Sequence, residues 1–397
     1  MLKIFLFILV IWNSIDAAQV VKVEEKYQSS ESCKSCHIHI VKEWESSWHA
    51  KSHYENDEYF RQSIDYVSRK TRKSLNSVKI QCATCHNPRI SVTKTDMDYE
   101  IMSVMDLDKG SKVNEALKSS AIDEGINCVV CHNIDKIHAD KDESLRGINR
   151  VSWTKSGTMT GPYDDSASPY HKVEHRDFMD KNSDQLCFVC HANDRADDGF
   201  VFTNMKNEYK NSENSCVDCH MGLKKLSYAA NLPIDKGKPK KREIRAHGFV
   251  GAHTPDIWKD VLNLKLSQKG KNIVINILNP QPHNIPSGFG SRELIVELRY
   301  KNADNSTQTK AISLTNLYTN KRGKPTIPHL AVKSSGDMSI PAYGEKILQV
   351  LKEDGATSVE VTLYYRLVND EVRSILNLKD EIWSKKSFIT SKNLNLK

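Results

Sequence analysis

All ten cysteines of this 397-residue chain occur in five Cys-x-x-Cys-His pentapeptides, and this repeat constrains the fold more than any other feature. The five motifs begin at Cys33, Cys82, Cys128, Cys187 and Cys216. In this spacing two thiols can add to the two vinyl groups of one porphyrin while the adjacent imidazole binds the iron, so each motif predicts a covalent c-type haem. Structural zinc sites and disulfides are the alternatives for paired cysteines, but neither requires a histidine directly after every pair.

The motifs predict five covalently attached haem c groups, each holding one iron, as the cofactors of the protein. The predicted attachment residues are Cys33, Cys36, Cys82, Cys85, Cys128, Cys131, Cys187, Cys190, Cys216 and Cys219. The predicted first axial ligands of the irons are His37, His86, His132, His191 and His220.

All five motifs lie within residues 33–220, which leaves roughly 38 residues for each haem. This is too little protein for a separate apolar core around each porphyrin, so we expect the haems to pack against one another among short helices and loops. One helix is predicted from the spacing of Ile40, Val41, Trp44 and Trp48, and it would continue through His49 to residue 53. A second is predicted over residues 58–73.

The first 17 residues have the pattern of a Sec-type signal peptide. Lys3 precedes an apolar run over residues 4–12, and small residues follow up to Ala18. The run is shorter than the about 20 residues that a spanning helix needs, although an uncleaved anchor remains the alternative. We therefore expect an exported, periplasmic protein that does not span the membrane after cleavage.

The formal net charge of +7 is an incomplete guide to the binding partners, because it omits the cofactors. Each ferric haem with two axial imidazoles adds about −1, since two propionates outweigh one net positive iron centre. Five haems bring the protein close to neutrality. This balance gives no support to nucleic-acid binding.

The chain divides by composition into three parts after the signal peptide. Residues 18–223 form the predicted pentahaem cytochrome c domain, and residues 224–254 a Lys-rich linker that carries the candidate ligand His247. The alternative for the basic residues of this segment is a docking patch for an acidic redox partner. Residues 255–397 contain no cysteine and alternate apolar with polar side chains, which predicts strands near 262–266, 273–277, 294–300 and 359–365. A closing helix is predicted over residues 370–383. The predicted fold class is α+β multidomain, with a mainly α and irregular multihaem domain followed by a small antiparallel β-sandwich.

The second axial position of each iron decides whether a haem carries electrons or reacts with a substrate. Of the 15 histidines, ten lie outside the motifs and are candidates for it. They are His39, His49, His53, His138, His171, His175, His247, His253, His283 and His329.

Short segments around these histidines resemble multihaem cytochromes c related to the tetrahaem cytochrome of nitrifying bacteria, here with an added C-terminal β domain. The first is the Cys33 motif followed by Trp44, Ser47 and Trp48-His49. Similar segments are 125–138, 168–171, 245–249 and 283–288 with Arg292. The resemblance implies that the second axial ligands are His49, His138, His171, His247 and His283. His53, His175 and His253 compete with His49, His171 and His247.

The leading functional hypothesis is an electron-transfer protein of anaerobic respiration, working between a membrane quinol dehydrogenase and a periplasmic reductase or other acceptor. The alternative is an oxidoreductase that acts on a small nitrogen or sulfur compound at a haem with an open axial position. The Cys-x-x-Cys-Lys variant that marks the active haem of nitrite reductase relatives is missing, so no catalytic residue is assigned. A third possibility is an assembly module in which the sheet domain docks a partner.

Overall fold

The computed structural model describes residues 29–87, 89–90, 92–118, 123–139, 145–155, 157–210, 212–231 and 240–397. The predicted signal peptide and the centre of the predicted basic linker, residues 232–239, lie outside this range. In the described part of the chain, no helix is both long and apolar enough to cross a membrane.

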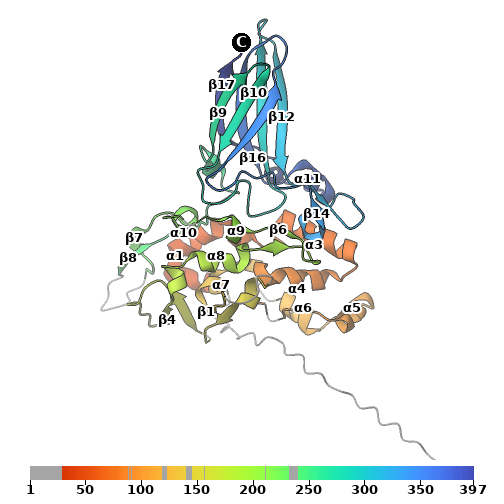
Figure 1. Ribbon diagram of the computed structural model, residues 1–397. Coiled ribbons are helices and arrows are strands. Elements are labelled where there is room, and N and C mark those ends of the chain that lie inside the picture. Colours follow the sequence, from red (N-terminus) through yellow and green to blue (C-terminus); the bar gives the residue numbers. More distant parts are fainter. Residues whose placement is uncertain are drawn as a thin grey trace, which may run out of the picture.

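The helices are short and lie mostly in the first half of the described chain (Figure 1). The α-helices are α1 (Glu31–Ser46), α2 (Trp48–Lys51), α3 (Glu58–Thr71), α4 (Leu75–His86), α5 (Met97–Val104), α6 (Lys112–Leu117), α7 (Cys128–His132), α8 (Asp184–His191), α9 (Met205–Glu208), α10 (Cys216–His220) and α11 (Asp370–Leu376). The 3-10 helices are η3 (Gly147–Arg150), η4 (Asp177–Met179), η5 (Pro255–Trp258), η6 (Pro328–Leu330) and η7 (Glu381–Trp383).

The described strands form a three-stranded and a four-stranded sheet in the C-terminal part, and five two-stranded sheets, of which only β13-β14 lies in that part. The strands before residue 255 are β1 (Ile134–Ile137), β2 (Val151–Trp153), β3 (Thr158–Gly161), β4 (Lys172–His175), β5 (Asp194–Arg195), β6 (Val201–Thr203), β7 (Lys225–Tyr228) and β8 (Lys241–Ile244). The later strands are β9 (Asn263–Lys269), β10 (Asn272–Leu278), β11 (Glu293–Asn302), β12 (Thr307–Thr315), β13 (Tyr318–Thr319), β14 (Lys333–Ser334), β15 (Glu345–Leu351), β16 (Ala356–Arg366) and β17 (Ser387–Asn395).

Helix α3 confirms the helix predicted over residues 58–73 to within two residues, but the predicted helix through residue 53 is wrong. Ser47 has extended backbone angles (φ −77°, ψ 161°) and its side chain accepts a hydrogen bond from the N–H of Ala50. Serine competes well for such an N-cap position, so it ends α1 and starts the separate helix α2. Helix α2 stops at Lys51, which leaves His53 in a turn.

Strands β9, β10, β11 and β16 confirm the four strands predicted from alternating hydrophobicity. They belong to an antiparallel three-stranded sheet ordered β15-β10-β9 and an antiparallel four-stranded sheet ordered β12-β11-β16-β17. Ile273, Ile275 and Ile277 on β10 are fully buried in a core that also takes side chains from β11 and β16. The two sheets thus enclose one apolar layer.

The predicted closing helix over residues 370–383 is wrong in length. Helix α11 ends at Leu376 because Asn377 takes the left-handed conformation (φ 53°), which commonly terminates helices. The chain then turns through η7 and ends in β17, a strand that the sequence reasoning missed and that pairs with β16. Similarly, the described ends of the segment predicted as a linker form an antiparallel hairpin of β7 and β8.

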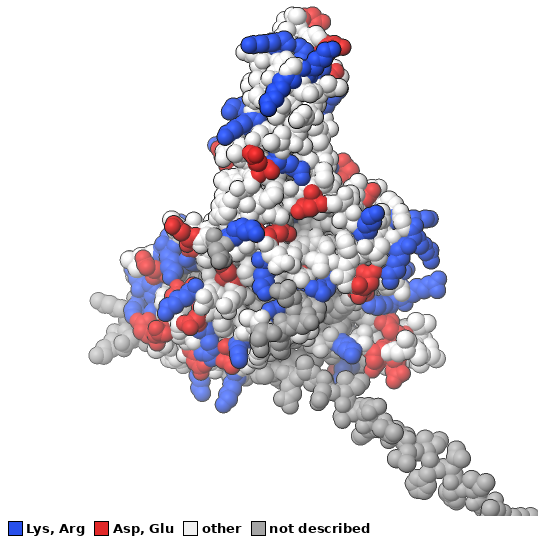
Figure 2. All heavy atoms as spheres, in the orientation of Figure 1, with Lys and Arg blue, Asp and Glu red and all other residues white. Residues whose placement is uncertain are grey.

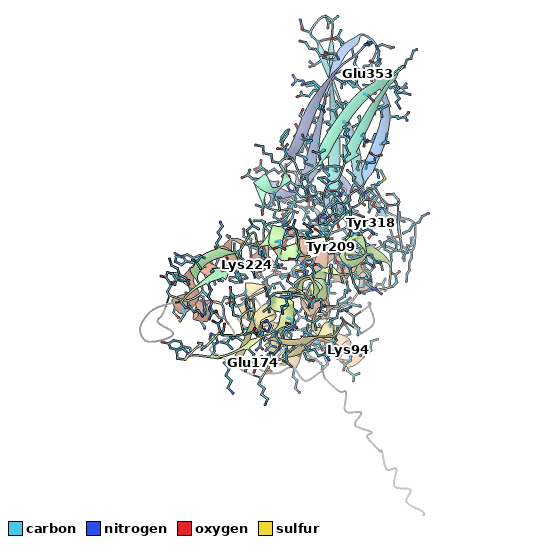
Figure 3. All side chains as sticks on the ribbon, turned by 60° about the vertical axis from the view of Figure 1, so that its left-hand side comes forward. Lys94, Glu174, Tyr209, Lys224, Tyr318 and Glu353 are labelled. Atoms are coloured by element: carbon cyan, nitrogen blue, oxygen red, sulfur yellow. The ribbon has the colours of Figure 1, made fainter. Side chains whose placement is uncertain are left out.

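One end of the sheet domain contacts the helical part of the molecule, as Figure 1 shows. Tyr318 and Tyr209 lie near this junction, whereas Glu353 lies at the far end of the sheets (Figure 3). Tyr59 and Ile64 of α3 belong to the same apolar core as the sheet side chains, so this core is continuous across the junction. Glu58 of α3 adds polar contacts to this core.

The Glu58 carboxylate accepts hydrogen bonds from the N–H groups of Lys379 (2.8 Å) and Asp380 (2.9 Å) and from Nε1 of Trp383 (2.8 Å). We expect Glu58→Ala to lower the free energy of unfolding by about 2 kcal/mol, because it leaves three donors at the junction without their acceptor. Chemical denaturation followed by tryptophan fluorescence measures the change. The control is Glu381→Ala, which removes an exposed carboxylate nearby and should change the free energy by less than about 0.5 kcal/mol. Equal effects of the two variants would contradict this role of Glu58.

Candidate haem centres

Each of the five Cys-x-x-Cys-His motifs lies on a short helix. Helices α7 and α10 consist of the motif alone, α4 and α8 end at the motif histidine, and α1 contains the first motif near its start. A helix places residues three and four positions apart on one face, so both thiols and the imidazole of a motif can reach the same group. The local fold therefore suits the attachment chemistry predicted from the sequence.

The motifs also lie against one another, although they are far apart in the sequence. A neighbouring thiol and burial raise the pKa values of Cys33, Cys190 and Cys216, and these neighbours are Cys128, Cys85 and Cys187, respectively. Cys131 lies close enough to Cys187 for their charges to interact. These neighbours connect the five attachment points into one branched group, in which the first motif lies beside the third, and the fourth lies beside the second, the third and the fifth.

Four motif histidines face a second imidazole at nearly constant spacing. The ring centroids are 6.4 Å apart for His37 and His171, 6.3 Å for His191 and His49, 6.2 Å for His132 and His247, and 6.3 Å for His220 and His283. Two imidazoles on opposite sides of one metal ion, each with a metal–nitrogen bond of about 2 Å, have centroids roughly 6 Å apart. The four pairs therefore fit a haem iron between them.

Hydrogen bonds also set the orientation of most of these rings. The Nδ1 atoms of His37, His132 and His220 lie 2.6, 2.7 and 2.6 Å from the carbonyl oxygens of Ala229, Thr160 and Val250. Nδ1 of His247 and Nδ1 of His283 bond carbonyl oxygens at 3.0 and 2.9 Å. Because a carbonyl oxygen only accepts, Nδ1–H donates in each case and the lone pair of Nε2 stays available for a metal.

Burial keeps several of these imidazoles in the neutral form that metal ligation needs. Burial, together with neighbouring histidines, lowers the pKa of His49 to about 3 and that of His247 to about 4. The pKa values of His132, His191 and His283 are also lowered, chiefly by burial.

The structure places the five predicted second ligands in two different situations. His49, His171, His247 and His283 lie opposite motif histidines. His138 lies at the end of the β1–β2 hairpin, where its backbone N–H bonds the Arg150 carbonyl and its Nε2 lies 2.7 Å from Oγ of Ser152. Among the competing histidines, His175 contacts Asp164 (3.0 Å).

The second motif has surroundings of its own. Nδ1 of His86 lies 2.6 Å from the hydroxyl oxygen of Ser52, and Phe60 stacks on the ring at 4.0 Å. Among the residues that the structure describes, no second imidazole makes a ring contact with His86. The buried His329 is close enough for its charge to contribute to the lowered pKa of His86, which is about 4 and mainly due to burial.

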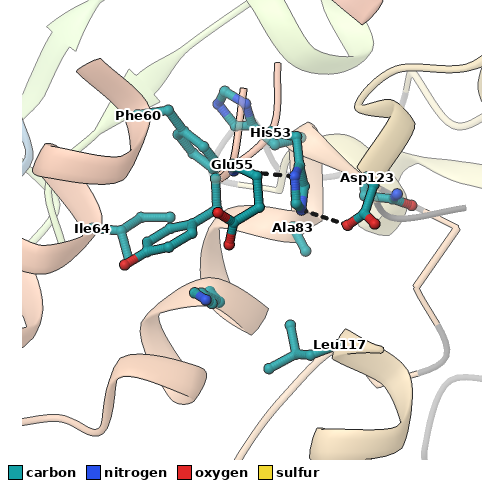
Figure 4. A pocket seen from close by; sticks show the side chains of 11 residues that line it. His53, Glu55, Phe60, Ile64, Ala83, Leu117 and Asp123 are labelled. Atoms are coloured by element: carbon teal, nitrogen blue, oxygen red, sulfur yellow. Dashed lines mark hydrogen bonds and ion pairs between the residues drawn. The ribbon is translucent and has the colours of Figure 1, made fainter. Parts of the chain in front are cut away.

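A cavity of about 90 Å³ borders this motif helix and is lined in part by His86, His53 and Lys79 (Figure 4). His53 accepts a hydrogen bond from the N–H of Glu55 (3.2 Å) and lies 3.6 Å from Asp123. Sequence reasoning did not find Ser52, Phe60 or His329 at this motif. No motif marks them, since they come from a turn, from α3 and from the sheet domain.

The fold is shared with a solved structure described as a penta-heme cytochrome c552 from Thermochromatium tepidum. The match has a TM-score of 0.67 and 20% sequence identity, and it covers 93% of this chain and 98% of that one. A match to a hypothetical protein from Pyrococcus horikoshii OT3 has a TM-score of 0.18, 8% identity and coverages of 36% and 92%, too low to carry an argument. No protein-family model and no curated protein matches the chain. The chain therefore has the fold of a pentahaem c-type cytochrome.

His253, which competed with His247 as a ligand, instead stacks on Trp48 at 3.7 Å and meets the edge of Trp383. Burial lowers its pKa to about 3, well below the usual 6.5. Above pH 6.5 His253 is neutral in both the folded and the unfolded chain, so its full contribution to the free energy of unfolding is present. Between pH 6.5 and 3 only the unfolded chain binds the proton, so this contribution is lost as the pH falls.

Replacing His253 by phenylalanine keeps an aromatic stack and removes the titrating group. Between pH 7 and pH 4.5 we expect the parent to lose about 2 kcal/mol more unfolding free energy than the His253→Phe variant. Denaturation curves at a series of pH values measure this difference. A His39→Phe variant, altered at an exposed histidine, should follow the parent. Parallel curves for the parent and His253→Phe would contradict the prediction.

Proposed function

We propose that this protein is an exported pentahaem c-type cytochrome that transfers electrons through closely packed haems. The observation that carries the proposal is the set of four opposed imidazole pairs with centroids 6.2–6.4 Å apart. The penta-heme fold supports it independently. The bound haem supplies a reversible one-electron couple, and the residues of the chain determine where it lies and how it is ligated.

The chain contributes to electron transfer by filling both axial positions and by bringing the attachment points together. An iron with two imidazoles has no open position for a substrate and keeps the same ligands in both oxidation states. Cys33 lies beside Cys128 and Cys187 lies beside Cys216, so neighbouring motifs are side by side in the fold. Electrons can then pass between haems without a large movement of the protein.

The setting of this activity follows from the sequence. The predicted Sec-type signal peptide supports a periplasmic location, and the resemblance of short segments to the tetrahaem cytochromes of nitrifying bacteria supports a respiratory role. We propose a membrane quinol dehydrogenase as electron donor and a periplasmic reductase as acceptor. His49, His171, His247 and His283 are the proposed second ligands, and His138 is the least supported of the five predicted ones.

The ligand assignment is tested by changing one distal histidine at a time. His247→Ala and His283→Ala should each convert one low-spin ferric haem of five to a high-spin form, because each removes one axial imidazole. Magnetic circular dichroism of the oxidised protein measures the change. The control His39→Ala removes an exposed histidine and should leave the spectrum as in the parent. An unchanged spectrum in His283→Ala would show that this residue is not a ligand.

A second candidate function rests on His86, which faces no second imidazole in the described part of the chain. An iron with a free axial position can bind a small molecule. The alternative function is therefore an oxidoreductase acting on a small nitrogen or sulfur compound at the haem of the second motif. Its Nδ1 partner is a serine hydroxyl and not a carbonyl, which also distinguishes His86 from His37, His132 and His220.

Carbon monoxide separates the two functions because it binds only ferrous haem with an exchangeable position. The second candidate predicts that the reduced parent binds one equivalent per chain at the second motif and that His283→Ala binds two. Optical titration gives both stoichiometries. No binding by the parent would exclude the second candidate and leave electron transfer alone.

A further inference from the structure

Positive side chains gather where the end of α3 approaches a loop of the sheet domain. Figure 2 shows Lys and Arg side chains clustered at this side of the molecule. We name this group the basic patch. Its members are Arg69, Lys70, Arg72, Lys73, Lys321, Arg322 and Lys324.

Two neighbouring aspartates show that the patch is continuous across the domain junction. Lys73 Nζ lies 2.9 Å from Asp197, and Lys321 Nζ lies 3.7 Å from Asp198. Since Asp197 and Asp198 are adjacent in the chain, the end of α3 and the loop at residues 321–324 lie side by side.

Most of the positive charge of the patch is not neutralised. Seven cations and two carboxylates leave a net charge of +5 (7 − 2). Among the described residues, no carboxylate pairs with Arg69, Arg72, Arg322 or Lys324. By contrast, Lys240 and Arg242 within the predicted linker both contact Asp165. A group of free charges of one sign creates a field that attracts an oppositely charged partner.

The patch borders the second attachment motif. Asp197, which contacts Lys73, also accepts a hydrogen bond from Nε2 of Gln81. Gln81 directly precedes Cys82, the first thiol of this motif. A protein bound at the patch would therefore lie near the haem attached there.

Stabilisation of helix α3 accounts for only part of the patch. Cations in the last turn of a helix interact favourably with its dipole, and Arg69 and Lys70 occupy that turn. Lys321, Arg322 and Lys324 belong to another domain and lie at the end of no helix. All three side chains are exposed, and the exposed fraction of the Lys321 side chain is 78%.

We propose that the basic patch is the docking surface for a small acidic redox protein, which exchanges electrons with the haem of the second motif. This rests on the proposed electron-transfer function. A protein partner fits better than an anionic membrane, because the patch borders the second attachment motif and only a partner that carries a redox group can exchange electrons with a haem there. The exposed apolar run of α5, which includes Met97 and Val104, begins beside the patch, since Glu100 of this helix accepts a hydrogen bond from the N–H of Ser74 (2.7 Å), so the test below includes lipid vesicles.

The test uses a reduced flavodoxin, a small acidic flavoprotein, as the probe. In the reaction, the flavin hydroquinone loses one electron and a ferric haem of the intact pentahaem protein gains it. Stopped-flow absorbance gives the bimolecular rate constant at several ionic strengths. The test variant is Lys70→Glu/Arg72→Glu/Lys321→Glu/Arg322→Glu. The control, Lys269→Glu/Lys271→Glu/Arg299→Glu/Lys301→Glu, makes the same charge change at exposed positions of the sheets.

At low ionic strength we expect the patch variant to react about tenfold or more slowly than the parent, and the control to stay within about twofold. Added salt should slow the parent and leave the patch variant nearly unchanged. Equal rate constants for both variants would overturn the proposal. So would a patch variant that loses only binding to phosphatidylglycerol vesicles, which would indicate a membrane surface. Dithionite reduction of all three proteins separates these outcomes from failure of electron transfer itself, because it needs no docking.

Discussion

The opposed imidazoles are the interaction on which the rest of the structure depends. Each pair joins segments that are distant in sequence, such as His37 with His171 and His220 with His283. An iron accepts two such ligands only when both rings lie along one axis, so each pair constrains position and orientation together. The hydrogen bonds from Nδ1 to backbone carbonyl oxygens help to meet this requirement, because they orient each imidazole and leave its Nε2 available for the iron.

The sheet domain contributes to the haem region and is not merely attached to it. His283 lies on the loop after β10 and faces the fifth motif, while Glu58 of α3 holds the turn before β17. His329 lies near the second motif from the same domain. An apolar core shared between α3 and the sheets keeps these histidines in place. Loss of this junction would therefore move His283 away from the fifth motif and change the surroundings of the second motif.

Sequence reasoning was most successful where the chemistry is local. A few neighbouring residues are enough to recognise the Cys-x-x-Cys-His spacing and the helical periodicity of α3. The same is true of the alternating apolar and polar side chains in β9, β10, β11 and β16. The break at Ser47 and the early end of α11 depend on helix capping, and the strand β17 depends on pairing with β16. The hydrophobic pattern of a short sequence segment does not show these features. The resemblance named four histidines that the structure places opposite motif histidines, whereas the different environment of His86 depends on tertiary contacts with Ser52 and Phe60.

The central proposal is that four haems have two imidazole ligands each. Quantitative electron paramagnetic resonance of the fully oxidised protein, with spins integrated against the haem content, tests it most directly. The proposal predicts at least four low-spin ferric haems per chain. Two or more high-spin ferric haems per chain would contradict the four imidazole pairs.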